Sequence, residues 1–165
     1  MHPSAPLTEL LTRDQIAQFH RDGFLNYGAP VLTDDELNDL RDALARVMRG
    51  ESEGAPDANR NLLGKDSELV VTQVVNIWEA EPAFAAHLYN DRIVPMVAAL
   101  MGSDTIRVWH DQIQIKPPIV GGPTIWHQDF PYWPVIAPAD LVSAWVALED
   151  ADVENGCMRD RKSVV

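Results

Sequence analysis

The sequence is poor in basic residues and in cysteine, and it contains no long apolar run. Lys and Arg number 13 against 25 Asp and Glu, so the formal net charge of −12 argues against a nucleic-acid partner. A single cysteine, Cys157, allows no internal disulfide and favours a reducing compartment. The most apolar run, IVPMVAALMG at 93–102, is about half as long as a membrane span.

The start of the chain, MHPSAPLTELLTRDQ, also lacks the charged segment and apolar core of a signal peptide. We therefore expect a cytoplasmic protein that neither spans a membrane nor binds nucleic acid. With 165 residues, 46% apolar and 23% charged, the composition is that of one globular domain.

The first hundred residues carry the signals of helices. Thr12 with Gln15, and Thr33 with Glu36, have the spacing of capping boxes, and a glycine follows each apolar-periodic stretch at the position of a helix stop. The two helices are predicted over 12–23 and 33–50. Two more are expected at Pro82–Tyr89 and Asp91–Met101, with Pro82 in a tolerated first turn.

After Gly102 the pattern changes to that of strands. In TIRVWHDQIQIKPP, at 105–118, His110 and Gln112 share one face with the alternating apolar residues before them. TIWHQDF at 124–130 and LVSAWVALEDA at 141–151 are also rich in β-branched and aromatic residues. We therefore predict an α+β chain, with a helical part at about 7–102 and a β-sandwich or barrel part at about 104–159.

The most informative spacing is His-x-Asp at His127 and Asp129. On a strand, residues i and i+2 project from one face, so the imidazole and the carboxylate would share one space. They would then offer two of the three ligands of a 2-His-1-carboxylate iron site. The alternative is a hydrogen-bonded pair that ties down the end of a strand.

The segments IQIKPP, GGPTIWHQDFPYWP and LVSAWVALEDADVENGCM together resemble the phytanoyl-CoA dioxygenase-like family of Fe(II)- and 2-oxoglutarate-dependent oxygenases. The resemblance runs from about Leu7 to Met158. It implies an incomplete double-stranded β-helix, a jelly-roll or cupin-like barrel, behind the helices. It also implies Fe(II), with 2-oxoglutarate and O2 as co-substrates, and hydroxylation of an unactivated C–H bond in a small organic substrate. The carboxylate of Asp129 favours hydroxylation over halogenation.

The resemblance also implies roles for single residues. His127 and Asp129 would be the catalytic iron ligands, and Tyr132 and Trp133 would line the mouth of the substrate site. Four residues would border the 2-oxoglutarate site: His110, Gln112, Gln128 and Trp145. Without the family, His110 reads as an ordinary sheet histidine, Trp145 as core, and the aromatic pair as a cap on the barrel.

The family also implies a second histidine ligand, and an arginine for 2-oxoglutarate, after the NGCM strand. No histidine follows Asp129; the five lie at positions 2, 20, 87, 110 and 127. The ending DRKSVV, with a stop codon, is the translation of GAT-CGG-AAG-AGC-GTC-GTG-TAG, which resembles a sequencing-library adapter. We therefore expect a truncated oxygenase domain at 1–159, inactive as it stands, and a non-native tail at 160–165. A natural short variant is the alternative.

Two other functions stay open at this point. One is a non-catalytic β-barrel binding protein that has lost its metal, which a metal titration would identify. The other is a cupin-type metalloenzyme that does not use 2-oxoglutarate, which succinate release would distinguish from an oxygenase.

Overall fold

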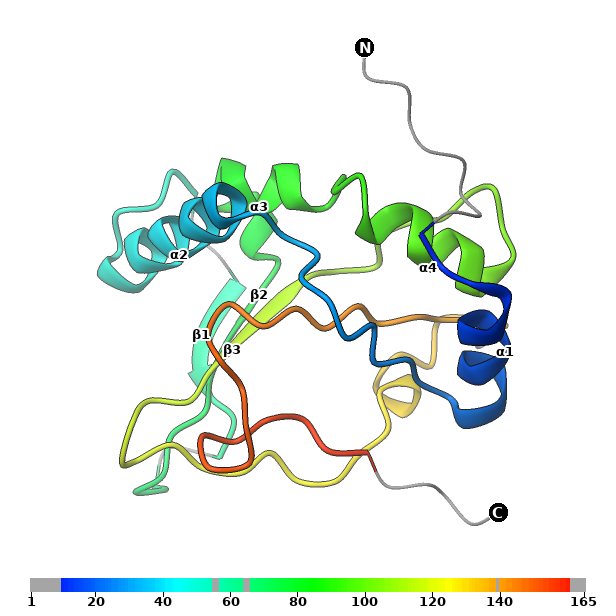
Figure 1. The fold of residues 1–165 in the computed structure, drawn as a ribbon. Helices are drawn as coiled ribbons and strands as arrows, with labels where there is room; N and C mark the ends of the chain where they lie inside the picture. The colour runs from blue at the N-terminus through cyan, green and yellow to red at the C-terminus, as the bar shows by residue number, and fades with distance from the viewer. Residues whose placement is uncertain (1–9, 55–56, 64–65, 139, 161–165) are drawn as a thin grey trace.

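A computed structural model describes residues 10–54, 57–63, 66–138 and 140–160. In Figure 1 a row of helices crosses the top of the view, a small sheet lies below it on the left, a further helix lies on the right, and long extended segments run between them. The elements in chain order are α1 (Arg13–Asp22), α2 (Asp34–Arg49), β1 (Asp57–Asn61), β2 (Thr72–Val75), the 3-10 helix η2 (Ile77–Glu79), α3 (Pro82–His87), α4 (Ile93–Met101), β3 (Gln112–Ile115) and the 3-10 helix η3 (Phe130–Tyr132). This confirms the α+β class. Within the described residues, no helix has the length and apolar character to cross a membrane.

Both predicted capping boxes are present, and they explain where α1 and α2 begin. The Thr12 side chain accepts a hydrogen bond from Gln15 N, and Gln15 Oε1 accepts one from Thr12 N at 2.8 Å. Thr33 and Glu36 repeat the arrangement at the start of α2. The backbone N–H of Thr33 is also the main reason why the pKa of Glu36 lies below its ordinary value. A left-handed glycine follows each helix, as predicted.

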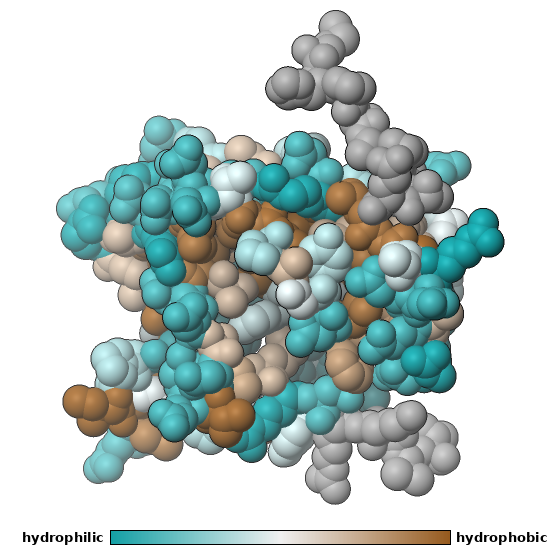
Figure 2. Space-filling model, viewed as in Figure 1, coloured by the Kyte–Doolittle hydropathy of each residue, from teal (hydrophilic) through white to brown (hydrophobic). Residues whose placement is uncertain are grey.

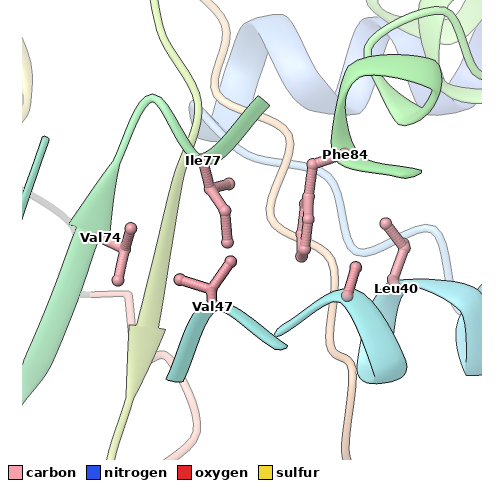
Figure 3. Close-up of a cluster of buried hydrophobic side chains, with 6 residues drawn as sticks. Leu40, Val47, Val74, Ile77 and Phe84 are labelled. Atoms are coloured by element: carbon pink, nitrogen blue, oxygen red, sulfur yellow. The ribbon is translucent and has the colours of Figure 1, made fainter. Parts of the chain in front are cut away.

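The sheet has three antiparallel strands in the order β1-β2-β3. Thr72 pairs with Ile115 and Val75 with Gln112, so β2 is central. The main core cluster packs this sheet against α2 and α3, as Figure 3 shows: Val74 and Ile77 face Leu40, Ala43 and Val47 of α2, with Phe84 of α3 beside them. A second cluster, formed by Leu11, Met96 and Leu100, fills the space between α1 and α4.

One charged pair reinforces the contact between α2 and α3. The Glu81 side chain is only 2% exposed, and both of its oxygens accept hydrogen bonds from Arg46, at 3.1 Å from Nε and 2.7 Å from Nη2. These bonds raise the pKa of Arg46. A buried carboxylate is tolerated when it is paired in this bidentate way, so the pair fixes how α2 meets the segment that leads into α3.

The strands predicted after Gly102 are present only in part. Of the predicted strand in 105–118, only Gln112–Ile115 forms a ladder, and 124–130 and 141–151 form none. The physical reason is that a strand needs a partner: within the described residues β3 pairs with β2 alone, and the other segments lie beside no complementary edge. The described residues thus contain a three-stranded sheet and no closed barrel.

The remaining differences from the sequence predictions concern the ends of helices and of the chain. The helix predicted at Pro82–Tyr89 ends at His87, and the one predicted from Asp91 begins at Ile93. Residues 7–9 of the predicted helical part lie outside the described residues. The expected non-native tail also lies outside them, apart from Asp160, and stays a prediction.

Candidate functional site

The chain enters the His-x-Asp motif through a close approach of backbone to side chains. Val70 N donates to Val120 O at 2.7 Å, and Gly122 N donates to Val70 O at 3.1 Å, so the segment before the motif runs along residue 70. A Cβ at the buried Gly122 would lie 2.3 Å from Leu63 Cδ1 and 3.0 Å from Leu69 Cβ. Any larger residue would have to displace Leu63 and press against Leu69, so glycine is favoured where the chain turns toward the motif.

The side chains of His127 and Asp129 lie side by side. His127 Nε2 is 3.2 Å from Asp129 Oδ1, and the two side chains are 35% and 45% exposed. The strand geometry expected for this pair is wrong: Asp129 has helical backbone angles and is the N-cap of η3. The turn into η3, rather than the two-residue repeat of a strand, brings the carboxylate beside the ring.

Both ring nitrogens of His127 face a hydrogen-bond acceptor. Nδ1 is 2.8 Å from the carbonyl oxygen of Ile125, while Nε2 faces the carboxylate. A neutral imidazole has one N–H for these two acceptors, and with that proton on Nδ1, where the contact is shorter, the ring donates to the Ile125 carbonyl. Nε2 then directs a lone pair at Asp129 Oδ1. This contact is repulsive unless a proton or a metal cation lies between the two atoms.

Ser143 forms a hydrogen bond with the other carboxylate oxygen of Asp129. The sequence did not predict a role for this residue. Its Oγ donates to Asp129 Oδ2 at 3.2 Å. The segment that carries Ser143 is tied to α2, because Arg41 Nε donates to Leu148 O at 2.6 Å and pairs with Glu149. The signal available in the sequence was an isolated polar residue in the apolar run LVSAWVAL, two residues before Trp145.

The predicted aromatic neighbours form two edge-to-face pairs. Tyr132 meets His127 with ring centroids 6.0 Å apart, and Trp133 meets His110 at 5.1 Å. Gln112 makes a side-chain contact within the sheet, where its amide oxygen accepts a hydrogen bond from Gln73 on β2.

The remaining predicted site residues are on the surface. Gln128 is exposed, and Trp145 is 56% exposed, so its interpretation as a core residue is wrong. On the face drawn in Figure 2, brown apolar residues reach the surface in several places, including the lower-left corner where Figure 1 has the turn after β3. The aromatic surroundings of the pair are thus open to solvent in this chain.

Two polar groups of residues 104–160 are shielded from solvent, Asp111 in part and Thr124 Oγ1 fully. Burial raises the pKa of the Asp111 carboxyl, whose Oδ1 is 3.5 Å from Trp78 N. Thr124 Oγ1 is buried and has no hydrogen-bond partner among the described residues. Lys116, which follows β3, donates from Nζ to Gly156 O at 3.1 Å and so ties the end of β3 to the turn at 152–157.

The donor set for a metal is therefore the His127–Asp129 pair. Within the part of the chain that the structure describes, no group of three or more His, Cys, Asp or Glu side chains could hold an ion. Two ligand atoms that share an ion in adjacent positions, each at about 2.1 Å, lie about 3 Å apart. The distance of 3.2 Å between Nε2 and Oδ1 fits that arrangement. The backbone carbonyl on Nδ1 is also the usual outer partner of a metal-bound histidine.

Comparison with known proteins shows similarity to one enzyme family. The family model described as phytanoyl-CoA dioxygenase (PhyH) matches residues 19–159. The peroxisomal phytanoyl-CoA dioxygenase of Mus musculus is 29% identical over 158 residues, which cover 90% of this chain and 46% of the relative. The enzymes of the same name from Rattus norvegicus and Bos taurus are 28% identical with the same coverage. The chain thus spans about half the length of the relatives it matches.

Proposed function

Since the chain belongs to the phytanoyl-CoA dioxygenase family, we propose that it supplies two of the iron ligands of an Fe(II)- and 2-oxoglutarate-dependent oxygenase. The reaction is hydroxylation of an unactivated C–H bond in a small organic substrate. The activity belongs to the whole protein, and the chain covers 46% of its mouse relative. The cytoplasmic location stays a prediction; the mouse, rat and bovine relatives are named as peroxisomal.

One observation carries the proposal: acceptors on both nitrogens of His127. The carbonyl of Ile125 takes the proton on Nδ1, and the lone pair of Nε2 and the oxygen of Asp129 are left 3.2 Å apart. A divalent cation satisfies both atoms at once, and imidazole with carboxylate is a ligand pair that suits Fe(II). The same contact without a metal needs a proton between Nε2 and Oδ1, on the ring or on the carboxyl group.

The roles of the chain's own residues follow from their places. Iron with 2-oxoglutarate and O2, when bound, would supply the oxidising power for hydroxylation. His127 and Asp129 would hold the ion by one edge and leave its other positions open. Tyr132, against the His127 ring, would limit the approach of substrate and water from that side.

We assign the co-substrate side of the site to the residues that the resemblance picks out: His110, Gln112, Gln128 and Trp145. The pairing of His110 with Trp133 would orient both rings. The extended segments at 104–111, 122–128 and 141–149 are proposed as strands of a double-stranded β-helix. Their extended, partly exposed backbones are suited to ladder pairing.

A metal titration tests the proposal on the chain itself. We expect Co²⁺, used as an air-stable substitute for Fe(II), to bind at a site that His127→Ala and Asp129→Ala each weaken at least tenfold. Two ligands hold an ion weakly, so the titration has to reach millimolar Co²⁺. His20→Ala is the matched control, because His20 is exposed in the last turn of α1. Equal Co²⁺ affinity in His127→Ala and the unchanged protein would leave a plain ion pair and overturn the proposal.

A further inference from the structure

We propose that Ser143 is a positioning residue for Asp129, one that decides which carboxylate oxygen faces the metal. The inference rests on the proposed function, since it concerns the same ion. It adds a residue that lies 14 positions along the chain from the ligand and on a different segment.

The two oxygens of Asp129 have different partners. Oδ2 accepts from Ser143 Oγ at 3.2 Å, while Oδ1 lies 3.2 Å from His127 Nε2. A hydroxyl donor on Oδ2 occupies a lone pair of that oxygen and directs Oδ1 toward the histidine. The carboxylate is thereby set to bind through one oxygen.

The serine is held by the fold. Leu148, five residues farther along its segment, packs against the main core cluster, and Arg41 of α2 donates to the Leu148 carbonyl at 2.6 Å. Arg41 also pairs with Glu149 at 3.1 Å. The position of the Ser143 hydroxyl is therefore linked through one short segment to α2, which contributes Leu40, Ala43 and Val47 to the main core cluster.

The hydroxyl matters because the end of an aspartate side chain rotates freely. The torsion that turns the carboxyl plane is broad and two-fold, so without a partner either oxygen, or both, can face the ion. Coordination through both oxygens would occupy a position that a co-substrate needs. Removal of an outer hydrogen-bond partner of a metal ligand typically weakens metal affinity by roughly 10- to 100-fold. We expect the lower end of this range, because Asp129 is partly exposed.

The test is a Co²⁺ titration that follows affinity together with the visible absorption spectrum of the bound ion. Ser143→Ala should weaken binding roughly tenfold and change the spectrum, because the geometry of the carboxylate changes. Ser143→Thr keeps the hydroxyl and should restore both properties. Ser103→Ala is the matched control: the Ser103 hydroxyl is also exposed, and it donates to Thr105 O at 2.7 Å and accepts from Thr105 N at 3.2 Å.

The outcomes separate this inference from the proposed function. If His127→Ala loses Co²⁺ but Ser143→Ala binds like the unchanged protein with the same spectrum, the metal site stands and the role of Ser143 is wrong. If His127→Ala keeps full affinity, the site itself is wrong. Should Ser143→Ala fail to fold by circular dichroism, Ser143→Val, which has the shape of Ser143→Thr without its hydroxyl, must show the weakened affinity; full affinity there would also overturn the inference.

Discussion

The two halves of this chain differ in how they are held. In residues 10–102, apolar side chains pack inward, and every buried apolar residue of the described chain lies at or before Leu100. In residues 104–160, by contrast, most large apolar side chains are exposed, among them Trp109, Trp126 and Val135. The first half is a packed support. The second half consists mainly of extended segments that contact the first half through β3 and through Arg41. The candidate metal site lies on these segments.

Two matched substitutions should show this difference with the largest effect. Phe84→Ala removes a ring from the main core cluster and should lower the free energy of unfolding by about 4 kcal/mol. Phe130→Ala makes the same chemical change at an exposed position in the second half and should cost less than about 1 kcal/mol. Urea denaturation followed by circular dichroism measures both values. Equal losses would mean that the second half is packed as well as the first.

The same contrast explains what the sequence could predict. Helix ends were readable because they depend on neighbours in the chain: Thr12 and Thr33 reach residues three positions on, and glycine alone adopts the following turn easily. The strands were not predictable in this way, because alternation shows which side chains share a face but does not show which strand edge is available for pairing. Only the segment 112–115 pairs with such an edge, that of β2.

The candidate site follows the same division. From their spacing, the side chains of His127 and Asp129 were expected to be neighbours, and they are, although a turn and not a strand brings them together. Ser143 and the Ile125 carbonyl could not be foreseen, because the first comes from a distant segment and the second is a backbone group. Such contacts depend on how segments lie in space, which periodicity does not encode.

Lowering the pH should change the stability contributed by the two halves in opposite directions. Burial lowers the pKa of His87 on α3 below its ordinary 6.5, against a smaller opposite effect of Glu36. Below pH 6.5 the unfolded chain therefore binds the proton first, and stability falls as the pH drops through the folded-state value. Urea midpoints between pH 7 and 5 should decrease, and His87→Gln should flatten that slope. An unchanged slope in His87→Gln would contradict the assignment.

Asp111, in the second half, should act in the opposite direction. Burial raises its pKa above the ordinary 3.8, so the folded chain holds this proton to a higher pH than the unfolded chain does. Its contribution to stability is present below pH 3.8 and is lost as the pH rises through the folded-state value. Asp111→Asn should therefore gain stability relative to the unchanged protein between pH 4 and 7. A loss over the whole range would show that the Asp111 carboxylate stabilises the chain in its charged form.

The smallest effect on stability should come from Arg41, although it carries the link between the halves. Arg41→Ala removes the hydrogen bond to Leu148 O and the pair with the largely exposed Glu149, which together should contribute about 1 kcal/mol. Limited proteolysis should nevertheless become faster across 141–149 and stay unchanged in α3, because the core beneath keeps its packing. Arg49→Ala is the matched control, since Arg49 lies on the same helix and pairs with Glu51, two positions farther on. If cleavage becomes equally fast in α3 and in 141–149, Arg41 supports the core itself, and the metal site is held by the whole fold instead of by one anchor.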